Sequence, residues 1–173
     1  MNYKHNFVTY LETLQEDRGA LAALRRGLGQ LPGNAPEMFP YVVNKLPGKA
    51  YPGSWTEKTY YLVASLYALH PESATKGNFG THFAQTLDLK NPDNNEATER
   101  RFTALLTAHA EDLPYYLRQA ISFLKSKEVP VNWHQLMGHL LQWNHPERVI
   151  NVQKRWAAQF WQRQKKDDDK DAE

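Results

Sequence analysis

Arginine side chains lie off the apolar stripes of several predicted helices, where they could bind an anionic partner. A guanidinium group is planar and carries five N–H donors, so it suits phosphate oxygens and can stack on bases. The body of the chain is also basic, because residues 1–166 carry 20 bases and 14 acids, a net charge of +6. Such a body can hold a nucleic acid by counterion release if its bases cluster. These arginines are Arg18, Arg25, Arg26, Arg100 or Arg101, Arg118, Arg148 and Arg155.

The same arginines have a simpler interpretation, since charged residues also cover ordinary solvent-exposed helix faces. Glu96 and Arg100, for example, are four residues apart and can pair on one helix. The sequence has no helix-turn-helix, RRM or KH signature, so any binding of nucleic acid should be directed at the backbone and not at base sequence. Both interpretations stay open on charge alone.

Other residues that could do chemistry do not form a recognisable site. His134 and His139 are five residues apart, not the four that place two imidazoles over one metal ion on a helix, and no Glu lies between them. No serine lies in the strand–turn–helix context of a hydrolase nucleophile. The glycines of residues 27–33 lack the spacing and the lysine of a phosphate-binding loop. We therefore expect no enzyme, no metal site and no cofactor.

Composition limits the class of protein further. The 173 residues suffice for one domain or two small ones with a sizeable core, and 41% of them are hydrophobic. The chain has no cysteine, which excludes disulfides and thiolate metal sites. No apolar run approaches the roughly 18 residues of a membrane span, and the N-terminus does not resemble a signal peptide. We expect a soluble cytoplasmic protein with no membrane partner.

Apolar residues recur at helical spacing along almost the whole chain, and no stretch shows sustained alternation. The sequence therefore predicts an all-α fold of about eight helices in two small packed bundles, residues 1–90 and 91–164. Residues 165–173 are rich in aspartate and are expected to form a disordered acidic tail. The expected helices start near residues 6, 17, 36, 55, 81, 96, 111, 132 and 146.

Residues 132–161 are predicted to form a helical hairpin that is broken at Asn144-His145-Pro146. The apolar stripe of its first helix contains Trp133, and that of its second helix contains Trp156, so we expect these rings in the core. Arg148 and Arg155 lie opposite the second stripe. The hairpin should thus have one core face and one polar face.

Several of these segments together resemble the CasB family, the small subunit of the type I-E CRISPR surveillance complex called Cascade. The resemblance runs from about residue 7 to residue 161, and it rests on the order and spacing of the segments because no single motif is diagnostic. The matching segments are DRG to LRRG at 17–27, GNFG at 77–80, ERRF to LL at 99–106, DLP to LR at 112–118, VNW to LLQW at 131–143 and VQKRWA to F at 152–160.

The resemblance implies a non-enzymatic, all-α protein of two helical bundles that acts in antiviral defence. Two copies associate head to tail inside Cascade, against the repeated crRNA-binding backbone subunits and near the large subunit, so that contact with crRNA is indirect. Basic faces hold the target DNA strand and the displaced non-target strand, which stabilises the R-loop. Carried over by matching position, the nucleic-acid-binding residues are Arg25, Arg26, Arg100, Arg101, Arg118, Arg148, Lys154 and Arg155.

The chain departs from the family pattern at two places. Relatives often carry further basic residues after the Leu-Leu pair, where this chain has residues 107–110 as Thr-Ala-His-Ala. Gly138 replaces a helix former, at a cost of about 1 kcal/mol relative to Ala.

Two other functions compete with DNA binding: a purely structural helical adaptor that contacts only proteins, and a His-dependent nuclease that would need His134.

Overall fold

The computed structural model describes the backbone of residues 3–171 and the side chains up to residue 162. Within that range the chain is helical and has no strand, apart from one isolated bridge between Ser73 and Val131. The all-α prediction is confirmed. The α-helices are α1 Asn6–Thr13, α2 Arg18–Arg25, α3 Phe39–Val42, α4 Trp55–Leu69, α5 Phe79–Ala84, α6 Glu96–Leu106, α7 Leu113–Ser126, α8 Trp133–Leu141 and α9 Pro146–Asp171, with short 3-10 helices at Pro36–Met38, Val43–Lys45 and Pro92–Asn95.

Polar side chains fix the starts of several helices by accepting backbone N–H groups that have no partner inside the helix. Asp17 accepts from Ala20 N at 2.9 Å and so begins α2. Asn78 begins α5 with a reciprocal pair of bonds, since its side chain accepts from Thr81 N while Thr81 Oγ1 accepts from Asn78 N. The turn at Gly77-Asn78 is therefore a helix start.

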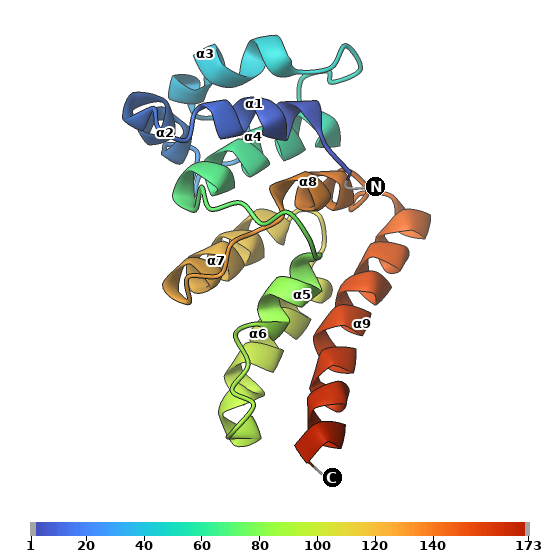
Figure 1. Ribbon diagram of the computed structural model, residues 1–173. Helices are drawn as coiled ribbons and strands as arrows, with labels where there is room; N and C mark the ends of the chain where they lie inside the picture. Colours follow the sequence, from blue (N-terminus) through green and yellow to red (C-terminus); the bar gives the residue numbers. More distant parts are fainter. Residues whose placement is uncertain (1–2, 172–173) are drawn as a thin grey trace.

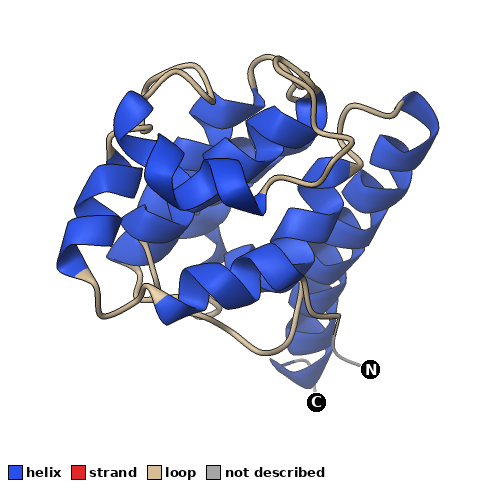
Figure 2. Cartoon of the chain, turned by 90° about the horizontal axis from the view of Figure 1, so that it is seen from above, coloured by secondary structure: helices blue, strands red, loops and turns tan. Residues whose placement is uncertain are grey.

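The described chain is built of helices joined by loops (Figure 2), and helix α4 lies between α1 and α8 in the upper half of Figure 1. All of its residues from Thr59 to Ala68 are buried, so it has no solvent-exposed face over that length. Helices α2, α7 and α8 all contact it, and α1 and α3 cover its remaining side. One continuous hydrophobic cluster connects this region with the other helices.

Helices α5 and α9 lie side by side along the lower part of the molecule in Figure 1. Their backbones touch, because a Cβ atom added to Gly80 would clash with the carbonyl group of Trp156. Asn78 Nδ2 also donates to Arg155 O at 3.2 Å. We call this contact, formed by Asn78, Gly80, Arg155 and Trp156, the α5–α9 junction.

The predicted hairpin of residues 132–161 is present as α8 and α9, with the break at the expected place. Trp133, Trp143 and Trp156 are buried, as expected for core residues, whereas Trp161 is 37% exposed. The Trp156 ring lies 5.1 Å from Phe79 and 5.2 Å from Trp143, between centroids. The hairpin therefore contributes core area to both α5 and the end of α8.

Two sequence-based expectations about helix bounds need correction. Residues 36–46 do not form one helix but two 3-10 turns around the short α3, because Pro40 has no N–H and its ring would clash with the carbonyl of Pro36 in a continuous α-helix. Helix α5 ends at Ala84, before Leu87. Helix α9 ends at Asp171, and the disordered acidic tail at residues 165–173 stays a prediction.

The division into bundles 1–90 and 91–164 stays a prediction. Helix α5 belongs by sequence to the first bundle, yet its main partner is α9. Residues 172 and 173 lie outside the described residues, and so do the side chains of the rest of the acidic tail. In the described part of the chain, no helix combines the length and the apolar character needed to cross a membrane.

Candidate nucleic-acid interface

All eight predicted nucleic-acid-binding side chains are exposed, and they lie on four helices. Arg25 and Arg26 end α2, and Arg118 lies in the second turn of α7. Arg100 and Arg101 are neighbours on α6. The remaining three, Arg148, Lys154 and Arg155, lie on α9.

The structure brings the α2 and α7 arginines to the same part of the surface. Arg118 packs against the loop that follows Arg25 and Arg26, since a Cβ atom added to Gly29 would lie 2.7 Å from Arg118 Nη1. Gly29 has φ +78°, a conformation that other residues adopt only with strain. Arg25 also has a structural contact, because its Nη1 donates to Ala68 O at 3.1 Å in the last turn of α4.

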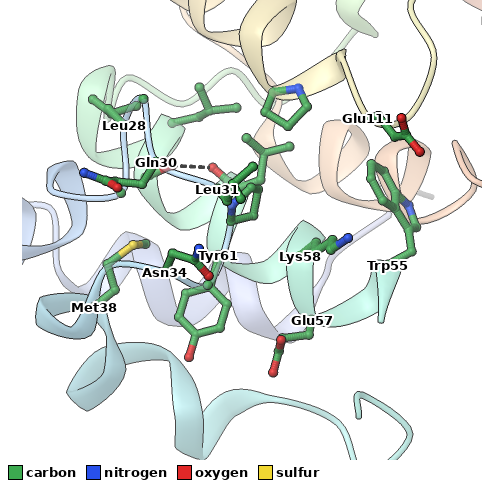
Figure 3. A pocket seen from close by; sticks show the side chains of 18 of the residues that line it. Leu28, Gln30, Leu31, Asn34, Met38, Trp55, Glu57, Lys58, Tyr61 and Glu111 are labelled. Atoms are coloured by element: carbon green, nitrogen blue, oxygen red, sulfur yellow. Dashed lines mark hydrogen bonds between the residues drawn. The ribbon is translucent and has the colours of Figure 1, made fainter. Parts of the chain in front are cut away.

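A groove of about 1070 Å³ lies beside Arg118 (Figure 3). The groove lies between three segments: the loop of residues 27–34, the first half of α4 and the start of α7. Its charges balance, because Arg118 and Lys58 are accompanied by Glu57 and Glu111. Leu31 and Tyr115 at the groove are strongly exposed, at 74% and 63%. The groove as a whole therefore does not favour an anion, whereas Arg118, the only arginine among its lining residues, does.

The adjacent arginines of α6 have different partners. Arg100 Nη1 lies 3.2 Å from Glu96 Oε1, the pair expected from their spacing, and both side chains are more than 70% exposed. Arg101 instead places its Cζ atom 4.6 Å from the centroid of the Phe123 ring on α7. Arg100 thus has a carboxylate partner, and Arg101 has an aromatic one.

The basic residues of α9 are separated from those of α2. In Figure 1 these helices lie on opposite sides of the molecule, with α4 and α8 between them. Arg155 lies at the α5–α9 junction, where its charge adds to the effect of burial in lowering the pKa of His139 to about 4. Lys154 lies beside a shallow surface pocket with Leu106 and Thr107. A nucleic acid that contacted both α2 and α9 would have to cross the molecule.

Comparison with known proteins identifies the family. The family model of the CRISPR-associated protein Cse2 matches residues 20–161. A Cse2 protein of Thermus thermophilus is 34% identical over 167 residues, which cover 93% of this chain and 91% of that protein. This chain belongs to the Cse2 family. Members of the family are also called CasB, so the resemblance found from the sequence is confirmed.

Solved structures of Cse2 proteins share the fold. The crystal structure of CasB from M. ruber has a TM-score of 0.75 and 28% identity, with 95% of this chain and 97% of that chain covered. A chain of a CRISPR RNA-guided surveillance complex has a TM-score of 0.77 and 26% identity, with 96% and 95% covered. The likeness therefore extends over nearly the whole of each protein.

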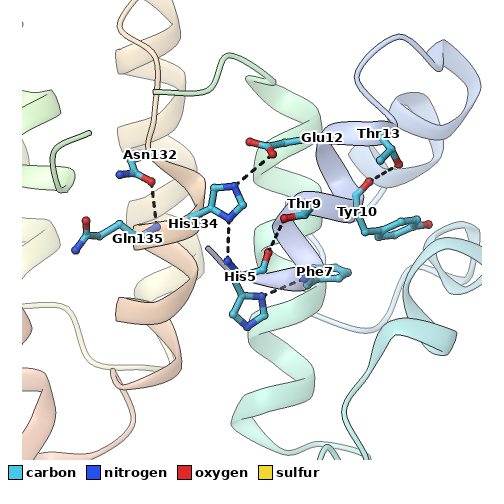
Figure 4. Close-up of polar contacts among 9 residues, drawn as sticks. All are labelled: His5, Phe7, Thr9, Tyr10, Glu12, Thr13, Asn132, His134 and Gln135. Carbon is cyan, nitrogen blue, oxygen red and sulfur yellow. Dashed lines mark hydrogen bonds and ion pairs between the residues drawn. The ribbon is translucent and has the colours of Figure 1, made fainter. Parts of the chain in front are cut away.

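The histidines of this Cse2 protein have structural partners. The backbone N–H of His5 donates to His134 Nδ1 at 3.0 Å, while His134 Nε2 lies 3.3 Å from Glu12 Oε2 (Figure 4). Trp156 Nε1 donates to His139 Nδ1 at 2.9 Å. Both imidazoles are buried and hydrogen-bonded. Among the described side chains, no cluster of three His, Cys, Asp or Glu residues could hold a metal ion.

Two lysines that were not predicted to bind nucleic acid lie beside the candidate arginines of this Cse2 protein. Lys58 lines the same groove as Arg118. Lys127 Nζ lies 5.8 Å from the centroid of the Phe123 ring that Arg101 also contacts. Because Lys127 follows Phe123 by four residues, the pair was visible in the sequence as an i,i+4 contact. Lys127 lies directly after the end of α7 at Ser126.

Proposed function

We propose that this Cse2 protein is a non-catalytic small subunit of the Cascade surveillance complex that binds the target and displaced DNA strands through exposed basic residues. Its protein partners would be the repeated crRNA-binding backbone subunits, the large subunit and a second copy of itself. Family membership supports the assembly, since a chain of similar fold belongs to a solved CRISPR RNA-guided surveillance complex.

One observation carries the DNA-binding part of the proposal. Of the eight candidate cations, only Arg100 has a carboxylate within 4.0 Å among the side chains that the structure describes. Unpaired surface cations retain a hydration shell and mobile counterions that a phosphate backbone can displace. The remaining seven, on α2, α6, α7 and α9, have no carboxylate partner among the described side chains, and of these Arg25 also donates to Ala68 O.

Contacts of this kind suit R-loop stabilisation. The RNA–DNA heteroduplex that forms is about as stable as the DNA duplex it replaces, so a small additional free energy decides the equilibrium. Arginine and lysine contacts to the phosphates of the displaced strand supply such free energy without reading its sequence. We expect affinity for DNA that falls steeply with salt and depends little on base sequence.

Charge reversal in the assembled complex tests the proposal. The variants are Arg25→Glu with Arg26→Glu, and Arg148→Glu with Arg155→Glu; Lys49→Glu, at an exposed lysine in the loop before α4, is the matched control. We expect each double variant to co-purify with the other subunits but to retain the displaced strand at least tenfold less well in a salt titration. The control should retain it as the natural protein does.

The same variants separate DNA binding from a purely structural adaptor. In an adaptor the arginines pair only with acids on neighbouring proteins, as Arg100 does with Glu96 within this chain. Charge reversal would then dissociate the complex and leave strand retention unchanged in whatever complex remained. Retention that did not vary between about 50 and 200 mM salt would also exclude the proposed basic contacts.

A further inference from the structure

One aromatic ring on α7 holds two cations from different parts of the chain. Arg101 on α6 places its Cζ atom 4.6 Å from the centroid of Phe123, and Lys127, just past the end of α7, places its Nζ atom 5.8 Å from the same centroid. Both distances fall within the roughly 6 Å over which a cation is attracted to a ring face. Arg101 and Lys127 are exposed, whereas Phe123 is half-buried. We call these three residues the Phe123 platform.

The core fixes the position of the ring. Phe123 lies 5.7 Å from Phe83, which is fully buried on α5 and lies 5.3 Å from Phe102 on α6. Phe102 in turn stacks on Phe160 of α9 at 4.3 Å. The platform is thus the outer end of a row of rings that spans α5, α6, α7 and α9. A cation held by this ring has a defined position, unlike one on a free side chain.

Neither cation has an acidic partner among the side chains that the structure describes, which end at residue 162. Among the described side chains no carboxylate lies within 4.0 Å of Arg101 or Lys127, although Glu128 directly follows Lys127. Two positive groups near one ring make the local potential more positive, which favours an anion there. A guanidinium that lies over a ring keeps its in-plane N–H donors free for a phosphate. The chemistry therefore fits a phosphodiester.

We propose that Arg101 and Lys127 together form a phosphate-binding site for single-stranded DNA, with Phe123 as the positioning residue. This inference rests on the proposed function and adds Lys127 and Phe123 to it. Arg101 then contributes more to binding than Arg100, because Arg100 already forms an ion pair with Glu96. The ring contributes by holding the cations in place and does not itself contact the DNA.

Fluorescence anisotropy of the full chain with a labelled oligothymidine, over a range of salt concentrations, tests the site. Lys127→Ala should weaken binding and reduce the slope of log affinity against log salt by about 0.7, the value for one phosphate contact on a single strand. Lys125→Ala is the matched control, because Lys125 is an exposed lysine on the same turn and does not contact Phe123. It should change binding and slope by clearly less.

Ring variants test the positioning role. Phe123→Leu keeps an apolar side chain but removes the ring, and we expect about two- to fivefold weaker binding. Phe123→Tyr keeps the ring and should restore the affinity of the natural chain. In a chain that already carries Arg101→Ala and Lys127→Ala, Phe123→Leu should have no further effect on binding. Thermal unfolding of each variant checks that the fold is retained.

The outcomes distinguish this inference from the proposed function. If the natural chain binds the oligonucleotide and Arg101→Ala weakens it, while Lys127→Ala and Phe123→Leu bind normally, the platform is wrong and the proposed function stands. Equal losses for Phe123→Leu and Phe123→Tyr would also overturn the platform, because the ring would then not be the cause. If the natural chain shows no salt-dependent binding, both proposals fail.

Discussion

At the α5–α9 junction two helix backbones touch, whereas beside Arg118 three segments stay apart around a groove of about 1070 Å³. The junction contains a glycine that no larger residue can replace and a buried tryptophan whose N–H has an imidazole partner. The groove contains balanced charges, exposed apolar side chains and an arginine at its edge. Substitutions should therefore affect folding at the junction and binding at the groove.

The largest expected effect is that of Gly80→Ala at the junction. The new Cβ atom would overlap the carbonyl of Trp156, which belongs to a helix backbone and cannot rotate away. Because overpacking a rigid contact typically costs about 1–3 kcal/mol and here involves backbone, we expect the free energy of unfolding to fall by about 3 kcal/mol or more. Urea denaturation followed by circular dichroism measures it.

Gly48→Ala is the matched control for this variant. Nothing lies within 4 Å of a Cβ atom at Gly48, and its φ is not positive. The control should change the free energy of unfolding by less than about 1 kcal/mol. If Gly80→Ala were as stable as Gly48→Ala, the helices would not be in backbone contact and the comparison between junction and groove would fail.

The next largest expected effect is a loss of stability at the junction in acid. Burial lowers the pKa of His82 to about 4, and burial together with the charge of Arg155 lowers that of His139 to about 4. His82 Nε2 accepts from Asn132 N and His139 Nδ1 accepts from Trp156 Nε1, so each must stay unprotonated at the accepting atom. Both groups favour the neutral form in the folded state.

The sign of the pH effect follows from these pKa values. Between pH 6.5 and pH 4 the unfolded chain binds more protons at both histidines than the folded chain does, so the free energy of unfolding decreases as pH falls. We expect a loss of about 2 kcal/mol for each histidine between pH 7 and pH 5, measured by urea denaturation at each pH. His139→Gln should reduce this dependence, and His145→Gln, at an exposed histidine, should not. A stability that stayed constant to pH 5 would contradict the prediction.

Arg118→Ala tests whether a substitution at the groove affects binding and not folding. Among the described residues its guanidinium makes no ion pair and no hydrogen bond, so the free energy of unfolding should change by less than about 0.5 kcal/mol. Binding of single-stranded DNA should weaken, with a salt slope lower by about 0.7. Arg118→Lys, which keeps the charge, should retain most of that slope. A large loss of stability with unchanged binding would assign Arg118 to the fold instead.

The sequence predicted the helices of this protein better than the contacts between them. Helical periodicity depends on residues within a few turns of one another, so the buried faces of α4, α8 and α9 were correctly assigned. The contact between Gly80 and Trp156 joins residues that are 76 positions apart, and no local pattern reports it. From the sequence, Gly80 was therefore only one residue of the GNFG segment that matches the family.

Two further residues show the same limit. Gly138 was predicted to be a weak position in α8, and in the structure a Cβ atom there would lie 3.0 Å from the Tyr3 ring of the N-terminal segment. The pairing of Arg100 with Glu96 was predicted because it is local, whereas the contact of Arg101 with Phe123 crosses from α6 to α7 and was not. Tertiary contacts thus decide which of the two neighbouring arginines has a carboxylate partner.

The smallest expected effect is that of Glu96→Gln, which releases Arg100 without touching the junction or the groove. Both partners are strongly exposed, so their ion pair is screened by solvent and contributes little. Glu96 also begins α6, where a negative charge is mildly favourable, and we expect the free energy of unfolding to fall by less than about 1 kcal/mol. Affinity for single-stranded DNA should rise by up to about twofold in a salt titration, because one more cation is free. Weaker binding would mean that Glu96 positions Arg100 for the phosphate, and that paired and unpaired arginines on this surface act alike.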